Sequence, residues 1–246
     1  MKSISGTHHW VTMGLAAALV ALPVQAAELR QSPKAVLELF TSQGCNSCPK
    51  ADALLTELSK RKDLITLAYH VDYWDYVGWK DTFGSTENSD LQRAYAKSWG
   101  SSRIFTPQLV VNGQSGVLGS RQKDVAAALE GAHLSLPVTL ALNNDVLEIG
   151  AEGVAGGREA MVWLVTYKDA AKVAIESGEN AGATMNYTSI VTGKQVLGMW
   201  EPGSGAHLKL PLKELLADGS NGLVILIQQD INGLPGPILG AASIQL

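Results

Sequence analysis

The chain has two cysteines, Cys45 and Cys48, and they lie close together in the stretch LELFTSQGCNSCPKADALL. A CxxC pair can exchange disulfides, hold a soft metal ion or form a structural bridge. The apolar run before the pair predicts a strand, and the apolar spacing after it predicts a helix. Because a helix N-terminus stabilises a thiolate, Cys45 is expected to react with a partner and Cys48 to resolve the mixed disulfide.

Residues 1–26 have the pattern of a secretory signal peptide. Lys2 precedes the apolar run VTMGLAAALVALPV, and the triplet VQA ends in a small residue suited to cleavage. The run is shorter than the roughly 20 residues that a membrane-spanning helix needs. We therefore expect a periplasmic or secreted protein that meets the membrane only through its transient signal peptide. In such a compartment disulfides persist.

Composition narrows the classes of partner and cofactor. The net charge is -4 and no basic patch is visible, which argues against nucleic acid as a partner. The sequence contains no phosphate-binding glycine loop, no serine-hydrolase elbow and no second CxxC of the zinc-binding type. No cofactor is therefore expected.

Two regions of the chain differ in their pattern of apolar and turn-forming residues. From about Lys34 to Ala132, short apolar runs alternate with helical stretches, which is typical of an α/β unit. From Leu136 onward, short strands are separated by Gly and Asn, which favours a β-sandwich. This predicts one domain over residues 27–135 and a β-rich C-terminal domain over residues 136–246.

A second motif, Thr106-Pro107, stands before a strand and an Asn-Gly turn in RIFTPQLVVNG. A strand, a CxxC, a helix, an X-Pro that opens a hairpin and a last helix together resemble the thioredoxin fold. The resemblance implies that Pro107 has a cis peptide bond beside the cysteines and that the backbone of Thr106 pairs with substrate. The fold expected from it is an α/β thioredoxin-like domain with a helical, aromatic-rich insertion at about residues 73–100, followed by a β-sandwich-like domain.

Four segments resemble one group of proteins more closely: LELFTSQGCNSCPKADALL, HVDYWDYVGWKD, ESGENAGATMNYTSIV and GPILGAA. They are similar to an exported bacterial thioredoxin-like family of unassigned function. Gly44 precedes Cys45 where thioredoxins have tryptophan, and Asn46-Ser47 separates the cysteines. The direction of electron flow and the redox potential are therefore not implied by the resemblance.

Further residues near the cysteines complete the predicted site. By resemblance, Glu38 in the preceding strand is the buried acid that exchanges a proton with the second cysteine; the alternative is a side chain that reaches solvent at a sheet edge. Nine of the fifteen aromatic residues lie between Tyr69 and Phe105. Trp74 and Trp79 are expected to contact a partner, although such rings also pack inserted helices.

The function predicted from the sequence is thiol-disulfide oxidoreductase. Cys45, Cys48, Pro107 and Glu38 would act in catalysis on exported proteins, on small thiols or on a thiol redox partner. One alternative is Cu(I) handling by the two cysteines with His70. The other is a binding module whose disulfide is only structural. The oligomeric state stays open.

Overall fold

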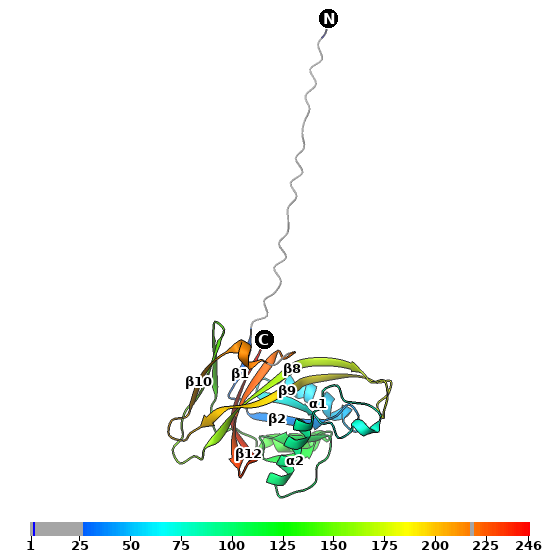
Figure 1. Ribbon diagram of the computed structural model, residues 1–246, viewed down its shortest axis with the longest axis horizontal. Coiled ribbons are helices and arrows are strands. Elements are labelled where there is room, and N and C mark those ends of the chain that lie inside the picture. Colours follow the sequence, from blue (N-terminus) through cyan, green and yellow to red (C-terminus); the bar gives the residue numbers. More distant parts are fainter. Residues whose placement is uncertain (1, 3–26, 217–218) are drawn as a thin grey trace.

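The protein, as a computed structural model, is described for residues 2, 27–216 and 219–246 (Figure 1). The predicted signal peptide lies outside the described residues, apart from Lys2. The strands are β1 (Glu28–Gln31), β2 (Ala35–Thr41), β3 (Leu64–His70), β4 (Gln108–Val111), β5 (Ser115–Leu118), β6 (Thr139–Asn143), β7 (Val146–Ala151), β8 (Ala160–Ala174), β9 (Thr184–Trp200), β10 (Ala206–Pro211), β11 (Gly222–Ile231) and β12 (Leu234–Gln245). The helices are α1 (Pro49–Ser59), α2 (Thr86–Ser98), α3 (Gln122–Glu130) and α4 (Leu212–Leu215), with a short 3-10 turn η1 (Asp75–Val77).

Nine of these strands form one mixed sheet in the order β1-β12-β11-β8-β9-β3-β2-β4-β5, and β10-β7-β6 form a second sheet. Strands β2 and β3 are parallel and buried along their whole length. Burial on both faces explains why their sequences are continuous apolar runs without polar alternation. Among the described residues, no helix is long and apolar enough to cross a membrane.

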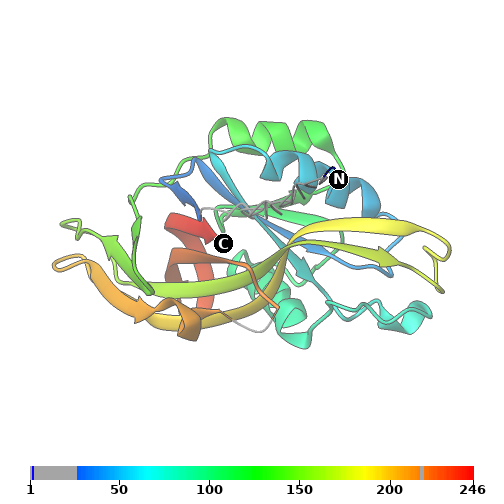
Figure 2. The ribbon, with the colours of Figure 1, turned by 90° about the horizontal axis from the view of Figure 1, so that it is seen from above.

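Helices cover both faces of the β3-β2-β4 part of the large sheet. Helices α1 and α3 pack on one face over a core that includes Leu37 and Leu39 (Figure 2). The other face packs Phe40 and Tyr69 against Tyr95 of α2 and against β11 and β12. Residues next to each other in β2 point to opposite faces, so this strand separates the two cores.

The stretch STENSDLQRAYAKSWG predicts a helix that ends at Gly100, and helix α2 follows these limits. The hydroxyl of Ser85 accepts a hydrogen bond from the backbone N–H of Asn88, which caps the first turn. At the other end Gly100 has a φ of +71°, a left-handed conformation that favours glycine and ends the helix. The predicted helix with its glycine stop is confirmed.

The hairpin of β8 and β9 is the longest in the protein, with strands of 15 and 17 residues. One half of it pairs with β11 inside the large sheet. The other half extends beyond the sheet past α1, so that its tip lies near the start of that helix (Figure 2). A residue from the C-terminal half of the chain, Asn180, is thereby brought to the cysteines.

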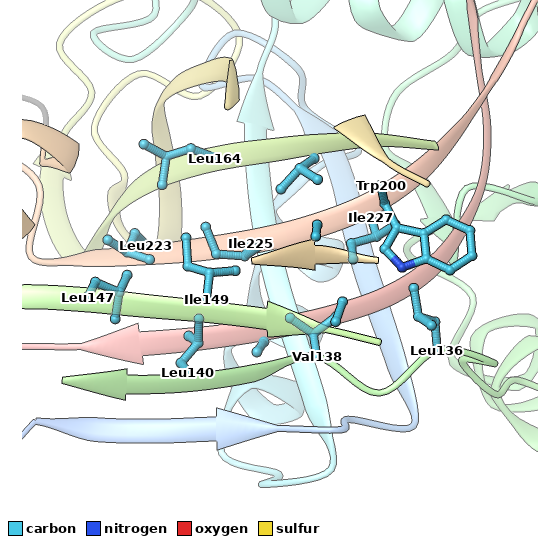
Figure 3. Close-up of a cluster of buried hydrophobic side chains, with 14 of the residues drawn as sticks. Leu136, Val138, Leu140, Leu147, Ile149, Leu164, Trp200, Leu223, Ile225 and Ile227 are labelled. Atoms are coloured by element: carbon cyan, nitrogen blue, oxygen red, sulfur yellow. The ribbon is translucent and has the colours of Figure 1, made fainter. Parts of the chain in front are cut away.

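A separate core lies between the two sheets. Leu147 and Ile149 of the small sheet face Leu164, Ile225 and Ile227 of the large one (Figure 3). Trp200 closes one end of this core and donates a hydrogen bond from Nε1 to the carbonyl oxygen of Glu152. The alternation of buried and exposed residues in β7 is the pattern expected of a strand with one face in the core.

The predicted fold class, an α/β thioredoxin-like domain followed by a β-sandwich-like domain, is wrong. The described chain is mostly β, and strands from both halves form one sheet, joined where Ala68 of β3 pairs with Ile190 of β9. Local sequence patterns identify strands, but they do not show which distant strand completes a sheet edge. Residue 136, the predicted domain boundary, falls in the loop between α3 and β6.

Candidate functional site

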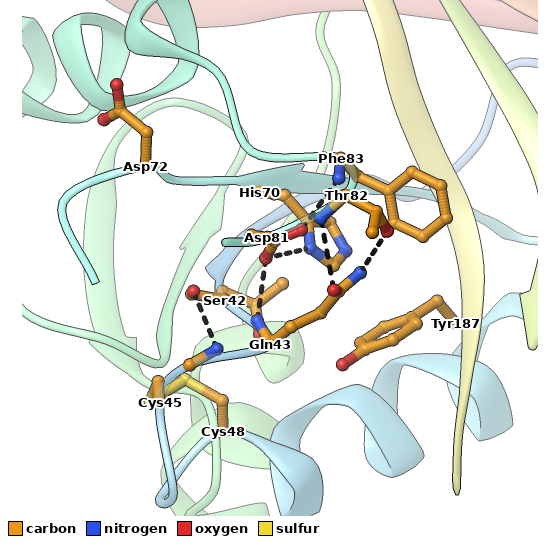
Figure 4. A network of polar contacts seen from close by, with 12 residues as sticks. Ser42, Gln43, Cys45, Cys48, His70, Asp72, Asp81, Thr82, Phe83 and Tyr187 are labelled. Atoms are coloured by element: carbon orange, nitrogen blue, oxygen red, sulfur yellow. Dashed lines mark hydrogen bonds and ion pairs between the residues drawn. A yellow bond between two sulfur atoms is a disulfide. The ribbon is translucent and has the colours of Figure 1, made fainter. Parts of the chain in front are cut away.

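Cys45 and Cys48 form a disulfide at the N-terminus of α1 (Figure 4). Cys48 is the N-cap residue and Pro49 is the first helical residue. The backbone N–H at that position has no partner within a helix, so proline costs no hydrogen bond there. The backbone N–H of Cys48 donates to the carbonyl oxygen of Cys45 at 3.2 Å, which closes a tight turn. Both cysteines have an exposed fraction of 0%, whereas Asn46 and Ser47 between them are exposed.

Two hydroxyl groups contact the sulfur of Cys45. The Thr106 hydroxyl donates to Cys45 Sγ at 3.4 Å, and Ser47 Oγ lies 3.4 Å from the same atom. The Ser47 hydroxyl also donates to the carbonyl oxygen of Thr106 at 3.4 Å. The Thr106-Pro107 peptide bond is cis, as the resemblance implied, and the carbonyl of Pro107 accepts a hydrogen bond from the Gly119 backbone N–H.

The aromatic segment reaches this site through two indole N–H groups. Trp74 Nε1 donates to Thr106 Oγ1 at 2.7 Å, and Trp79 Nε1 donates to Gln43 Oε1 at 2.8 Å. A Cβ atom added to Gly44 would lie 3.2 Å from the Cβ of Trp74, which gives a packing reason for glycine before the first cysteine. Hydrogen bonds within the protein therefore hold both tryptophans beside the cysteine turn, and their predicted contact with a partner stays a prediction.

The tip of the β8–β9 hairpin completes the enclosure. The side-chain amide of Asn180 donates to the carbonyl oxygens of Gln43 and Cys45, at 2.8 and 3.1 Å. The Ser177 hydroxyl donates to the carbonyl oxygen of Gly78 at 2.6 Å, which joins the tip to the aromatic segment. Residues 73–79 and 175–183, here named the cover, thus enclose the disulfide.

A group of buried ionisable side chains lies behind the cysteine turn. Asp81 Oδ2 accepts from the backbone N–H of Gln43 at 2.7 Å and lies 2.8 Å from His70 Nδ1 (Figure 4). On α1, Asp52 Oδ1 accepts from the Thr41 hydroxyl at 2.8 Å. Among the described residues, Asp52 Oδ2 and His70 Nε2 have no hydrogen-bond partner although both atoms are buried.

Burial affects the two carboxyl groups differently. Desolvation raises the pKa of Asp52 to about 7, and the electrostatic effect of His70 and the Thr41 hydrogen bond only partly oppose it. Desolvation also acts to raise the pKa of Asp81. There His70 and the backbone N–H donors of Gln43 and Phe83 outweigh it, so the pKa of Asp81 is lower than usual. One carboxyl group is therefore held ionised, while the other can take up and release a proton near neutral pH.

The structure places Glu38 on the other side of β2. Its Oε2 accepts from the Tyr95 hydroxyl at 2.6 Å, and Tyr95 in turn accepts from Gln228. Burial raises the pKa of Glu38, with Lys194 acting in the opposite direction. Glu38 is buried, as one of the two sequence interpretations had it, but its hydrogen bonds lead away from the disulfide.

Sequence reasoning missed Asp52, Gln43 and Asn180 as parts of the site. Asp52 was recognisable in PKADALL as a carboxylate on the same helix face as Cys48, four residues later. Nothing in the local sequence marks Asn180, because its place depends on the pairing of β9 with β3. His70, the third ligand of the Cu(I) interpretation, contacts Asp81, and the described residues contain no cluster of three or more His, Cys, Asp or Glu arranged to hold a metal ion.

Fold and site together define a mostly β protein with a CxxC disulfide enclosed at the start of a helix. The chain belongs to the family described as proteins of unknown function (DUF1223), whose model matches residues 36–228. It is similar to a protein from Agrobacterium tumefaciens known from an X-ray crystal structure, with 35% sequence identity and a TM-score of 0.76. That likeness covers 87% of this chain and 95% of the other. The comparison with curated proteins found no match.

Proposed function

We propose that the protein is an exported thiol-disulfide oxidoreductase that acts through Cys45 and Cys48 on the thiols or disulfides of exported proteins or of small molecules. The observation that carries this proposal is the environment of Cys45. Its sulfur belongs to a disulfide at a helix N-terminus and is contacted by the hydroxyls of Thr106 and Ser47. Hydroxyl donors and helix dipoles both stabilise a thiolate at that position.

The exchange proceeds through a mixed disulfide. A substrate thiolate attacks Cys45 Sγ, the Cys45–Cys48 bond breaks, and Cys48 leaves as a thiolate that takes up one proton. A second substrate thiolate then attacks the substrate sulfur of the mixed disulfide and releases Cys45. The substrate pair is oxidised by two electrons and the cysteine pair is reduced. The reverse sequence oxidises the protein pair.

Substrate approaches over the exposed face of the turn. Asn46 and Ser47 are exposed, whereas both sulfur-bearing residues are enclosed by the cover. Exchange with a protein thiol therefore requires the cover to move, and Trp74 and Trp79 would then contact the partner. The thiolate of Cys45 left after reduction keeps the Thr106 hydroxyl as its donor.

Full burial of the disulfide is also the observation that favours the competing function, a binding module with a structural bridge. An insulin-reduction assay with dithiothreitol as electron donor separates the two. The wild-type protein is expected to accelerate the reduction, and Cys45→Ser is expected to abolish the acceleration. Cys48→Ser should instead trap a mixed disulfide on Cys45. A wild-type rate equal to that of dithiothreitol alone would support the structural bridge.

A further inference from the structure

Asp52 lies one helical turn after Cys48 on the buried side of α1. The backbone N–H of Asp52 donates to the carbonyl oxygen of Cys48 at 3.1 Å. This is the hydrogen bond between residues four apart that defines an α-helix, so Cys48 already takes part in the first turn of α1. Residues four apart on a helix are neighbours, with Cβ atoms about 5–6 Å apart. Both residues are buried. Asp52 is thus a neighbour of the second cysteine on a buried face of the helix.

The two oxygens of this carboxyl group have different roles. Oδ1 is held by the Thr41 hydroxyl at 2.8 Å, while Oδ2 is buried without a hydrogen-bond partner among the described residues. A buried polar atom without a partner is unfavourable and calls for a physical explanation. A role in receiving and releasing a proton explains why Oδ2 has no fixed partner.

A cavity of about 300 Å³ connects this group to the surface. It is lined by residues of α1 and β9: Pro49, Asp52, Ala53, Thr56, Glu57, Thr184, Met185 and Asn186. Asn186 is exposed, so the cavity opens to solvent at the hairpin. Protons can therefore exchange between Asp52 and bulk water without crossing the cover.

Three ionisable groups on other elements face Asp52. His70 at the end of β3 and Asp81 in the following loop act on Asp52 electrostatically. The carboxyl groups of Asp52 and Asp81 both act electrostatically on Tyr187 of β9. Burial, followed by Asp52 and Asp81, raises the pKa of Tyr187, so this phenol stays neutral. The ring of His70 is fixed between Tyr187 and Phe83, with its Nδ1 on Asp81.

We propose that Asp52 is the acid–base group of the Cys45–Cys48 pair, with His70 as the positioning residue that sets its protonation. When the disulfide opens, the Asp52 carboxylic acid gives its proton to the Cys48 thiolate. When the disulfide closes, the Asp52 carboxylate takes the proton from the Cys48 thiol. The Cys48 thiolate then attacks Cys45 Sγ of the mixed disulfide, the bond between Cys45 and the substrate sulfur breaks, and the substrate leaves as a thiolate. This inference rests on the proposed function, because a disulfide that never opens needs no proton acceptor.

The test follows both cysteines with one reagent. Reduced protein is mixed with 5,5′-dithiobis(2-nitrobenzoate) in a stopped-flow instrument, so that Cys45 releases one thionitrobenzoate and Cys48 then releases a second. The rate of the second release reports proton removal from Cys48. For the wild type it should rise with an inflection near pH 7, the pKa of Asp52. Asp52→Asn should slow it at least tenfold at neutral pH and move the inflection toward the ordinary thiol value of about 8.5.

Three further variants separate a proton-transfer role from a structural one. Glu130→Gln changes an exposed carboxylate on α3, away from this cavity, and should keep the wild-type profile. Asp52→Glu should restore part of the neutral-pH rate. His70→Asn keeps the Asp52 carboxyl but removes the neighbour that lowers its pKa, so the inflection should move to higher pH.

The two proposals fail in different ways. If Asp52→Asn keeps the wild-type rate and inflection in the second release, Asp52 is not the acid–base group, although the exchange itself stands. If no second release occurs in the wild type at any pH, the proposed exchange fails. Should Asp52→Asn not fold, Thr41→Val replaces it, because loss of the hydroxyl donor must raise the pKa of Asp52 and move the inflection upward. An unchanged profile in Thr41→Val would then overturn the role of Asp52.

Discussion

At the scale of single residues, the site depends on where buried carboxyl groups point. Glu38 and Thr41 are an odd number of positions apart in β2, so their side chains lie on opposite faces. The Thr41 face meets α1 and holds Asp52, whereas the Glu38 face meets Tyr95 of α2. The strand position of Glu38 predicted a buried acid correctly, but the face that meets the cysteine-bearing helix carries a different one.

Burial of Asp52 predicts how stability changes with pH. Its pKa rises from 3.8 to about 7 in the folded protein, so its contribution is fully present below about pH 4 and is lost as the pH rises through about 7. In Asp52→Asn this loss, of up to about 1.4 kcal/mol per pH unit, should disappear. Urea unfolding of the oxidised protein over this range measures it, with Glu57→Gln as the control. Parallel pH dependences for wild type and Asp52→Asn would contradict the buried position of this carboxyl group.

At the scale of elements, access to the disulfide depends on segments that lie far away in the sequence. The 3-10 turn η1 and its flanks supply Trp74 and Trp79, and the tip of the β8–β9 hairpin supplies Asn180. The Asn180 amide donates both of its hydrogen bonds to the backbone of the cysteine turn. Movement of the hairpin tip must therefore break these bonds before Cys45 is accessible.

Removal of the Asn180 amide should make the disulfide easier to reach. Two hydrogen bonds, each with a net stabilising contribution of about 0.5–1.5 kcal/mol, are lost in Asn180→Ala. Together they amount to about 1–3 kcal/mol, so reduction of the Cys45–Cys48 bond by dithiothreitol is expected to be at least about 5-fold faster than in the wild type, as followed by thiol quantification. Asn186→Ala, an exposed position on the same hairpin, should keep the wild-type rate. Equal rates for Asn180→Ala and wild type would show that the hairpin tip does not limit access.

At the scale of the whole molecule, both halves of the chain share one sheet. The strands β8 and β9 pair with β11 in the C-terminal part and with β3 beside the cysteines. Even β1, at the start of the described chain, pairs with β12 at its end. The core between the two sheets and the cores around β2 are therefore parts of one structure.

A cavity in the core between the sheets should then destabilise the whole protein in one step. Leu147 is fully buried there, and Leu147→Ala is expected to lower the free energy of unfolding by about 2–5 kcal/mol. Urea unfolding should give the same midpoint by far-UV circular dichroism and by accessibility of the reduced cysteines to a thiol reagent. Two separated midpoints, with the cysteine region unaffected, would instead indicate two independent domains.

Local sequence patterns predicted much of what surrounds the cysteines. The strand before Cys45, the helix after Cys48 and the helix that ends before Gly100 are all present. The cis bond at Pro107, which the resemblance implied, is present as well. The predicted fold class was wrong, because the pairing of β9 with β3 joins residues more than 100 positions apart and leaves no local pattern. For the same reason, no local pattern indicates that Asn180 lies at the cysteine turn.

The reduction potential of the Cys45–Cys48 pair, measured by equilibration with glutathione redox buffers, tests the central claim most directly. Thiol-disulfide oxidoreductases have potentials of about -270 to -120 mV, whereas structural disulfides of secreted proteins lie below about -300 mV. Exchange chemistry at this site predicts a value within the first range. A value below about -300 mV would show that the bridge is structural and would contradict the proposed function.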